Sequence, residues 1–489
     1  MRRDWVIEKV KTLIIVVLFL TAILLLYFFW KGFSFDELRL ELPQVSSENV
    51  LRLSPEELVA PKDVQVTFGP DNYSLYTSNT GELWKSFLLD LASFSKSENI
   101  FVEEISLSQW IESMQLKSIR YTFSYPLPTS YLESLGVAGF SQASGLEAFT
   151  TIGYSVASRE SIFLSDRQTG KYYRMVSDRD YTSQDNQITS LETQPRSLCY
   201  PISMFYGAAN ATLLPYDLQS QLQPLAVHQE PAEDLEEYQQ RIAEEFFGEN
   251  LDFIRKITGE NNQVVYMYGV GERVLSLDPS GRLEYSQQPG NSGSTLSFYD
   301  TLVLASDFVA THGNWISFQK EPMDAYLIQA QALEENGRKS GYRFFFGDKA
   351  NGYPLYSQQG AQILVEVTGN QVTRYERNTL SILQTLTSPE PAGTAQACPI
   401  IEILPADYHI LAQILRQLGQ EVSGETPDDQ FNAVLQQISS VSLGYFEQIN
   451  GETGAVYYTP CWVIRLSGAN VFFDLYNGAY LGYLSETVR

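Results

Sequence analysis

The sequence predicts an α+β protein with one N-terminal transmembrane helix followed by three extracytoplasmic domains whose sheets are mainly antiparallel. The uncharged run Thr12–Trp30 predicts the helix, because its 19 residues would span about 28 Å, close to the ~30 Å hydrocarbon core of a bilayer. Beyond this run, short segments of alternating apolar and polar residues are separated by turn residues, which indicates strands and hairpins. Segments with helical spacing lie between these groups, as is typical of α+β domains.

The apolar run is predicted to stay in the mature protein as an anchor. A secretory signal has an apolar region of about 7–15 residues followed by small residues for cleavage, whereas this run ends in the bulky residues 27–30. Four basic residues lie within residues 2–11 and only Lys31 follows closely. Cytoplasmic flanks carry the excess of Lys and Arg. We therefore expect a single-pass protein of the cell membrane with a cytoplasmic N-terminus and its bulk outside the cell.

Composition shifts and turn-rich stretches divide the chain into predicted parts. TSPEPAGTAQACP (387–399), rich in Pro, Gly and Ala, is the clearest linker, and polar sequence around residues 189–197 marks another boundary. The predicted parts are a cytoplasmic tail (1–11), the transmembrane helix (12–30), a juxtamembrane spacer (31–61), an N-terminal α+β domain (62–196), a middle α+β domain (197–386), the linker (387–399) and a C-terminal α+β domain (400–489).

Each domain has its own pattern of elements. In the first, alternation predicts strands, and Thr169-Gly170 predicts a hairpin. A helix over 82–95 is predicted by the spacing of its apolar residues, which are Leu83, Phe87, Leu88, Leu91 and Phe94. The middle domain begins with a helix between Pro231 and Gly248 and has a second over about 300–311. Its predicted strands, in chain order, are VVYMYG, RVLSL, RLEY, YRFFFG, YPLYS and AQILVEVTGNQVTRYE, the last of these a hairpin.

The C-terminal domain is predicted to begin with a helix that Gly419 closes at the position after its C-cap. The strands VSLGYF, CWVIRL, NVFFDLY and AYLGYL follow, and Asn477-Gly478 predicts a type I′ hairpin turn between the last two.

Charge and cysteine content exclude some classes of protein. Residues 1–31 hold five basic and two acidic residues, so the remainder has 28 basic against 56 acidic residues and a net charge of −28. Such an acidic exterior excludes nucleic-acid binding and favours solubility. Three cysteines do not build a disulfide scaffold, and whether Cys398 pairs with Cys461 stays open.

Short motifs offer little catalytic chemistry. Ser93-x-x-Lys96 and Lys339-Ser340-Gly341 match two boxes of penicillin-binding enzymes, but matches this short arise by chance, and no Gly-x-Ser-x-Gly elbow is present. Other candidates are better explained structurally. These are the histidines His228, His312 and His409, which lack metal-ligand spacing, the turn pair Asp178-x-Asp180, the Gly269-x-Gly271 pair before strands, the glycosylation-like Asn210-Ala211-Thr212 and the strand residue Cys461. We expect no enzyme, cofactor or metal site.

Several stretches resemble the YycH family of Gram-positive bacteria. They are PKDVQVTFGPDNYSLYTSNTGELW (Pro61–Trp84), IRYTFSYPLP (Ile119–Pro128), Phe246–Tyr285, Gly341–Asn378 with its Asn-Gly-Tyr-Pro turn, VSLGYF (Val441–Phe446) and YYTPCWVIRLSGANVFFDLYNG (Tyr457–Gly478). No single stretch is specific, and their order along most of the chain carries the resemblance.

The resemblance implies a function. YycH proteins are bitopic regulators of the WalK (YycG) sensor histidine kinase, which controls cell-wall metabolism, and they work with a related membrane protein, YycI. Contact with the kinase is attributed largely to transmembrane helices. The resemblance therefore implies a non-enzymatic regulator with a WalK-like kinase and a YycI-like protein as partners. The sign of regulation, any ligand sensed outside and the oligomeric state, including a homodimer, stay open.

If the helix carries the contact, its spacing predicts one face. Helices pack in lipid through close contact and through small or hydroxylated residues, and Thr21 and Ala22 are the small residues deep in the span. The face predicted to bind a partner consists of Val17, Leu18, Thr21, Leu24, Leu25 and Phe28. The alternative functions are an extracytoplasmic inhibitor, because the hairpin-rich C-terminal part resembles PepSY modules, or an anchored cell-wall hydrolase.

Overall fold

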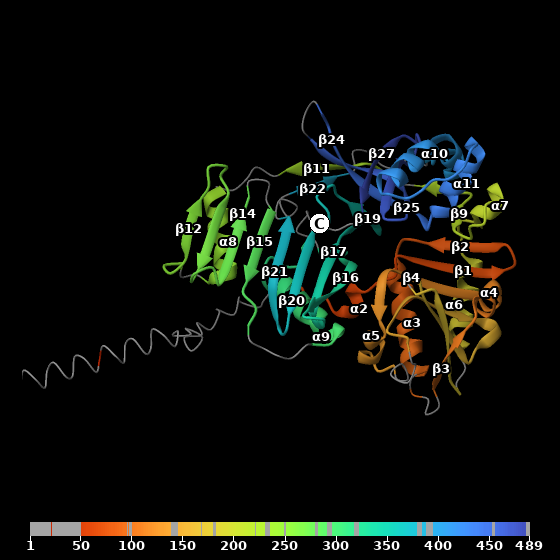
Figure 1. The fold of residues 1–489 in the computed structure, drawn as a ribbon, viewed down its shortest axis with the longest axis horizontal. Helices are drawn as coiled ribbons and strands as arrows, with labels where there is room; N and C mark the ends of the chain where they lie inside the picture. The colour runs from red at the N-terminus through yellow and green to blue at the C-terminus, as the bar shows by residue number, and fades with distance from the viewer. Residues whose placement is uncertain are drawn as a thin grey trace, which may run out of the picture.

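The computed structural model describes most of the chain after residue 49. The described residues are 21, 50–94, 96, 100–137, 145–167, 169–178, 182–220, 222–229, 235–248, 251–278, 282–290, 296–316, 322–378, 384–387, 395–451 and 455–485. They form three large sheets with helices packed on them, and nearly all strand pairs are antiparallel. The predicted α+β class with mainly antiparallel sheets is confirmed (Figure 1).

The first sheet has nine strands in the order β3-β7-β6-β5-β4-β1-β2-β8-β9. Its strands are β1 (Asp63–Gly69), β2 (Asn72–Tyr76), β3 (Phe101–Ile105), β4 (Ser118–Pro128), β5 (Ala148–Ser155), β6 (Ser161–Asp166), β7 (Lys171–Val176), β8 (Cys199–Pro201) and β9 (Leu213–Pro215). Its helices are α3 (Thr80–Phe94), α4 (Leu107–Gln115), α5 (Thr129–Ser134), α6 (Thr182–Thr193) and α7 (Ile202–Tyr206), with a 3-10 turn at Val156–Ser158. The predicted boundary after residue 196 falls between β7 and β8, which both belong to this sheet.

Side-chain spacing explains how this sheet is covered. In α3, Trp84, Phe87, Leu91 and Phe94 share the buried face, so the predicted helix over 82–95 is confirmed. The opposite sheet face is partly covered by α4, whose Trp110 and Met114 pack with Phe163. The predicted β6–β7 hairpin is also confirmed, with Gly170 in the left-handed region at φ 67°.

The second sheet has eight strands, all antiparallel, in the order β12-β13-β14-β15-β21-β20-β17-β16. They are β12 (Arg255–Thr258), β13 (Val264–Tyr268), β14 (Arg273–Leu277), β15 (Arg282–Gln287), β16 (Tyr326–Glu335), β17 (Arg338–Gly347), β20 (Ile363–Thr368) and β21 (Gln371–Asn378). Helices α8 (Leu235–Phe247) and α9 (Phe298–Thr311) pack on one face, where Phe246 contacts Tyr285 and Phe298 contacts Phe344. The two predicted helices of this region are confirmed.

The third sheet also has eight strands, and it takes strands from distant parts of the chain. It runs β18-β19-β24-β25-β11-β22, with β26 beside β25 and β27 beside β26, and β19 and β24 are parallel. The strands are β11 (Leu225–Gln229), β18 (Lys349–Ala350), β19 (Tyr353–Tyr356), β22 (Gln384–Thr387), β24 (Ser440–Ile449), β25 (Val456–Leu466), β26 (Ala469–Asp474) and β27 (Tyr480–Ser485). Helices α10 (Ile400–Gln417) and α11 (Pro427–Gln437) pack with it. A small two-stranded sheet joins β10 (Gln219–Ser220) to β23 (Ala395–Gln396).

The end of α10 and the turn after β26 test two predictions of local structure. Gly419 has φ 76° just beyond the C-cap Leu418, so the predicted helix end is confirmed. The type I′ turn predicted at Asn477-Gly478 is wrong, since only Gly478 has a positive φ there. Asp474 instead organises a longer turn, because its Oδ1 accepts hydrogen bonds from the N–H groups of Tyr476 (2.8 Å) and Asn477 (3.0 Å).

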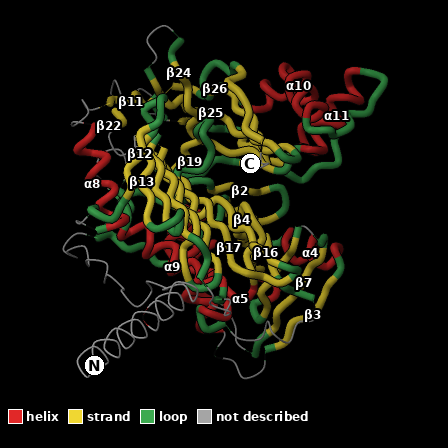
Figure 2. Tube along the Cα trace, turned by 60° about the vertical axis from the view of Figure 1, so that its left-hand side comes forward, coloured by secondary structure: helices red, strands yellow, loops and turns green. Residues whose placement is uncertain are grey.

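The first and second sheets share one hydrophobic core. Strand β16 of the second sheet lies next to β4 of the first, and α5 lies next to α9 (Figure 2). The third sheet contacts the first through a second apolar core, which includes Ile202 of α7 and Leu214 of β9. It also contacts the first sheet through polar groups: Lys62 Nζ donates to Ser440 Oγ at 3.1 Å, and Arg465 Nη2 donates to the Ser124 carbonyl at 3.5 Å. The three sheets therefore meet around the beginning of β1.

Candidate functional site

Residues 50–61, called here the docked segment, lead into β1 and lie within the predicted juxtamembrane spacer. Their short helix α2 (Pro55–Leu58) begins with Pro55, and the Ser54 N–H donates to Glu57 Oε2 at 2.8 Å. Proline is favoured at the first helical position, and the Glu side chain satisfies an N–H group that the helix leaves free. The spacer therefore has a defined structure from residue 50 onward.

The docked segment is fixed along α9 of the second sheet by a series of side-chain contacts. It runs antiparallel to α9, since its first residues contact the end of that helix and its later residues contact the beginning. The contacts are Leu51 N–H to Asn314 Oδ1 (3.0 Å), Arg52 Nε to Asp307 Oδ1 (3.7 Å, exposed), Ser306 Oγ to the Leu53 carbonyl (2.6 Å) and Tyr299 hydroxyl to Glu56 Oε1 (3.0 Å). Each joins residues more than 240 positions apart, so they are tertiary contacts rather than local capping.

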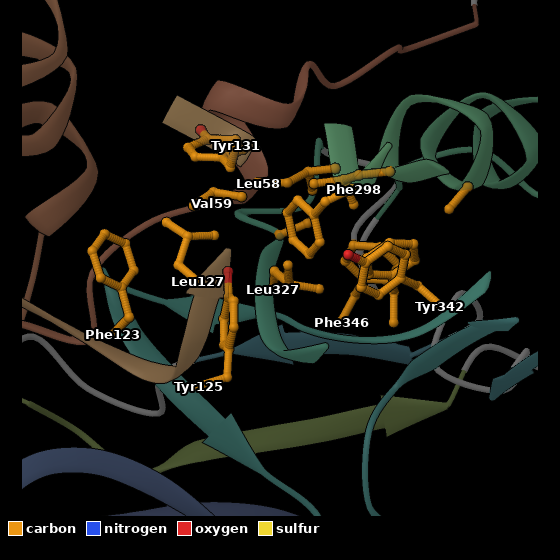
Figure 3. Close-up of a cluster of buried hydrophobic side chains, with 14 of the residues drawn as sticks. Leu58, Val59, Phe123, Tyr125, Leu127, Tyr131, Phe298, Leu327, Tyr342 and Phe346 are labelled. Carbon is orange, nitrogen blue, oxygen red and sulfur yellow. The ribbon is translucent and has the colours of Figure 1, made fainter. Parts of the chain in front are cut away.

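Burial fixes the other end of the docked segment between two sheets. Leu58 and Val59 are fully buried, and Figure 3 shows them between Tyr131 of α5 and Phe298 of α9. The rings of Tyr131 and Phe298 lie 6.0 Å apart at 89°, an edge-to-face contact. Burying an aliphatic side chain of this size stabilises a fold by about 1.5–3 kcal/mol. The segment is thus part of the core that holds the first and second sheets together.

Electrostatics keep the hydroxyl groups of this site protonated. Burial raises the pKa of Tyr299, and the nearby Glu56 carboxylate raises it further. Burial likewise raises the pKa of Tyr131 well above its usual value. Tyr299 therefore remains a hydrogen-bond donor to Glu56 at any physiological pH. The site therefore joins elements that lie far apart in the sequence.

The residues predicted to form the transmembrane face lie almost entirely outside the described part of the chain. Thr21 is described, as helical and exposed. Val17, Leu18, Leu24, Leu25 and Phe28 are outside the described residues, so the predicted face stays a prediction. Among the residues that the structure does describe, no helix is long and apolar enough to cross a membrane.

The structure separates the two motifs that resemble penicillin-binding enzymes. Ser93 and Lys96 are exposed at the end of α3 on the first sheet, and Lys339-Ser340-Gly341 lies in β17 of the second. Gly269 and Gly271 form the tip of the β13–β14 hairpin. These short matches are not brought together into a site.

Histidine and cysteine candidates take structural positions. His312 caps α9 and stacks on Phe308 with ring centroids 4.0 Å apart, and burial lowers its pKa to about 4. Cys461 is fully buried in β25, where Sγ donates to the Gly444 carbonyl at 3.4 Å and burial raises its pKa. All three cysteines are free thiols, so Cys398 and Cys461 do not form a disulfide.

The remaining candidates add no metal site. Asn210 Nδ2 donates to the carbonyls of Leu435 (2.6 Å) and Ile438 (2.9 Å), so the amide that glycosylation would need is already bonded. His228 lies in strand β11 of the third sheet, and His409 lies in helix α10, which packs on that sheet. Asp180 lies outside the described residues. Within the described part of the chain, no cluster of three or more His, Cys, Asp or Glu could hold a metal ion.

The docked segment was not predicted from the sequence. Two signals pointed to it: Ser54-Pro55 with Glu57 is a helix-start pattern, and the apolar pair Leu58-Val59 follows at once. Its partners lie some 250 residues away in α9, and no local pattern indicates such a contact.

Comparison with known proteins gives a likeness of fold. No family model matches the sequence, and no curated protein sequence matches it significantly. Among solved structures, the fold is similar to the crystal structure of YycH from Bacillus subtilis, with a TM-score of 0.49 and 12% sequence identity, over 86% of this chain and 97% of that one. The family to which that structure belongs is the one that the sequence resembles.

Proposed function

We propose that the protein is a membrane-anchored, non-enzymatic regulator of a WalK-like sensor histidine kinase that controls cell-wall metabolism. In this proposal residues 12–30 anchor the chain and contact the kinase, a YycI-like membrane protein takes part, and the three sheets lie outside the cell. The resemblance of the ordered sequence stretches supports the choice of partner, and the apolar run with its basic flank supports the anchor.

The docked segment is the observation that carries this proposal. A tether that only held the exterior near a membrane would have no need for fixed contacts just before the first strand. Here Leu53 and Glu56 bond to α9, and Leu58 is buried between two sheets. A change in how the sheets pack would therefore move the chain that leads to the predicted helix. Such a regulator shifts a kinase between states only by binding those states with different affinity.

Exchange of the predicted helix tests where the kinase is contacted. Residues 12–30 are replaced by an unrelated Leu-rich helix of the same length in the full chain, and kinase output is measured in cells. We expect regulation to be lost while membrane insertion and the folded exterior are preserved. Unchanged kinase output would instead place the contact on the exterior domains and would overturn this part of the proposal.

Weakening the docked segment tests whether the exterior acts through it. A full-length variant with Tyr299→Phe and Ser306→Ala loses two of its bonds but keeps the buried Leu58 and Val59. We expect regulation to weaken at an unchanged protein level. Thr189→Ala is the control, because this exposed hydroxyl bonds only within α6. Co-purification from membranes identifies the partner: a histidine kinase supports the proposal, whereas a protease would support the alternative of an inhibitor.

A further inference from the structure

Six apolar side chains gather at the outer edge of the second sheet, around β12. This strand forms one edge of the sheet, and β16 at the other edge lies beside the first sheet (Figure 1). None of the six belongs to the hydrophobic clusters of the described residues. They are called here the edge patch, which consists of Phe253, Ile257, Val265, Met267, Val270 and Val274.

Strand pairing makes four members of the edge patch neighbours. Ile257 of β12 lies opposite Val265 of β13, and Met267 of β13 lies opposite Val274 of β14. Val265 and Met267 are two positions apart in β13, so their side chains lie on the same face of the sheet. The four side chains are therefore cross-strand and same-face neighbours.

Helix α8 covers the opposite face of these strands. Lys256 Nζ lies 3.4 Å from Glu236 Oε1 of α8, and Tyr266 is buried in the core to which α8 contributes. Lys256 and Tyr266 alternate along their strands with members of the edge patch. Because successive side chains of a strand point to opposite faces, the four apolar side chains point away from α8.

The other two members of the edge patch lie in turns at one end of these strands. Arg255, the first residue of β12, pairs with Met267 near the end of β13. Phe253 lies in the turn just before β12, and Val270 lies in the turn just after β13, so the two turns are at the same end of neighbouring strands. Phe253 is 77% exposed and Val270 is 96% exposed.

Val270 protrudes from its turn. It lies between Gly269 and Gly271, which both have positive φ, 61° and 82°. Glycine has no side chain that could cover the valine. Turn positions usually carry Gly, Pro, Asn, Asp or Ser, so a valine at the tip, with Phe253 in the next turn, is an exposed apolar surface that calls for a partner.

The edge strand itself is poorly suited to pairing with another protein chain. β12 has four residues, all exposed, and two of them are Arg255 and Lys256. Short, charged edge strands resist the addition of a further strand. This argues against a partner protein or a second copy that would extend the sheet. A lipid phase needs neither a free strand nor a shaped pocket, because the hydrophobic effect is non-directional.

The predicted anchor brings a lipid phase within reach. Residues 31–49 lie between the predicted helix and the docked segment, and a chain of 19 residues spans at most about 65 Å. The longest strands of the second sheet have ten residues, about 34 Å. Either end of this sheet can therefore reach the bilayer. A tethered surface needs only a weak affinity, because the tether keeps its local concentration high.

We propose that the edge patch contacts the bilayer surface, with Phe253 and Val270 inserted at the boundary between headgroups and acyl chains. Arg255 of β12 and Arg273 of β14 flank the end of β13, where they suit the phosphates of anionic lipids. The contact would fix the orientation of the second sheet on the membrane. This inference rests on the anchor of the proposed function and does not depend on the identity of the kinase.

Quenching by lipid tests the contact in the full-length protein, reconstituted in vesicles of phosphatidylcholine and phosphatidylglycerol. Val270→Cys in a Cys398→Ser background carries a fluorophore, since Cys199 and Cys461 are buried. The vesicles contain or lack a lipid with a nitroxide on its acyl chain. We expect the nitroxide to reduce the fluorescence about threefold, because the label lies at the depth of the inserted turn.

Leu89→Cys in the same background is the matched control. Leu89 is 76% exposed on α3 of the first sheet, so its label should be quenched little. Equal quenching at the two positions in vesicle-bound protein would overturn the membrane contact. Flotation of the vesicles separates this outcome from failure of the anchor: protein that does not float with them would overturn the anchor and the inference together.

A second substitution assigns the quenching to the edge patch. Phe253→Ser in the Val270→Cys protein should reduce the quenching about twofold, because one of the two inserted side chains is lost. Leu116→Ser, at a 47% exposed position after α4, should leave it unchanged. Equal quenching in these two variants would contradict the assignment. Protection of the label from aqueous iodide in detergent, increasing with protein concentration, would place a second copy on the edge patch and would also overturn the proposal.

Discussion

The hydroxyl of Tyr299 donates a hydrogen bond to the carboxylate of Glu56 at 3.0 Å, joining α9 to the helix that precedes the first strand. The two residues lie 243 positions apart. This bond connects the segment nearest the predicted membrane anchor with the helix that covers the second sheet. The bond therefore links the segment before β1 to α9, and the strength of this link can be measured.

A double-mutant cycle measures this bond. Tyr299→Phe and Glu56→Ala are made singly and together, and the free energy of unfolding is determined in urea. We expect a coupling of about 1 kcal/mol, because a partly exposed hydrogen bond to a carboxylate contributes at the lower end of the range for charged acceptors. Coupling indistinguishable from zero would show that the two side chains do not interact in solution.

Truncation of Leu58 tests the packing of the docked segment. Leu58→Ala removes a fully buried side chain between α5 and α9 and should lower the free energy of unfolding by about 2–5 kcal/mol. Leu89→Ala is the matched control, because Leu89 of α3 is 76% exposed and its loss should change stability by less than about 0.5 kcal/mol. Similar losses in the two variants would contradict the buried position of Leu58.

Most local structure could be predicted from the sequence, because it depends on neighbouring residues. The helix over 82–95 follows from the spacing of its apolar side chains, and the β6–β7 hairpin follows from its glycine. The turn after β26 was predicted wrongly, because the Asp474 carboxylate accepts hydrogen bonds from the N–H groups of Tyr476 and Asn477 and so favours a longer turn. Side-chain acceptors of this kind change a turn without changing the strands around it.

The arrangement of the strands was harder to predict, because it depends on partners distant in sequence. The stretch YPLYS was correctly predicted as a strand, yet β19 leaves the middle sheet and pairs in parallel with β24 of the third. The stretch 387–399, rich in Pro, Gly and Ala, predicted a linker between the middle and C-terminal domains, whereas β11 and β22 on its N-terminal side both join the third sheet. The docked segment was missed for the same reason, since its contacts with α9 are long-range.

The thiol of Cys461 is predicted to be unreactive in the folded protein. It is fully buried, and burial together with the nearby Asp474 carboxylate raises its pKa, so little thiolate forms at neutral pH. A thiol reagent should modify Cys461 in urea but not under native conditions, as read by mass spectrometry of the digested protein. Rapid native modification at this residue would instead indicate a reactive cysteine and would reopen the enzymatic alternative.

The buried carboxyl group of Asp348 should make the stability of the fold depend on pH. It lies where the chain passes from β17 of the second sheet to β18 of the third, and it is 2% exposed. Burial raises its pKa to about 7, and the neighbouring Asp324 charge adds to this, while the Lys349 N–H at 2.9 Å and the positive charge of Arg377 act against it. The buried Tyr458 hydroxyl lies near the same carboxyl group.

The direction of the effect follows from proton binding. An unfolded Asp has a pKa of about 3.9, so between about pH 4 and 7 the folded state holds a proton that the unfolded state has lost. The contribution of Asp348 is therefore complete below about pH 4 and is lost as pH rises toward 7, at up to roughly 1.4 kcal/mol per pH unit. His312 acts oppositely, because its lowered pKa of about 4 makes the fold more stable as pH rises from about 4 to 6.5.

Comparison with Asp348→Asn separates the contribution of Asp348 to the pH dependence of stability from that of every other titrating group. The free energy of unfolding is measured for both proteins from pH 4.5 to 7.5, and the difference is taken at each pH. We expect the variant to gain stability relative to the parent as pH rises, because its amide stays neutral where the carboxyl group ionises. Glu133→Gln is the control, since Glu133 is exposed on α5, and its difference from the parent should stay flat. A flat difference for Asp348→Asn as well would mean that Asp348 is ionised in the fold across this range, and that the crossing between the second and third sheets does not respond to pH.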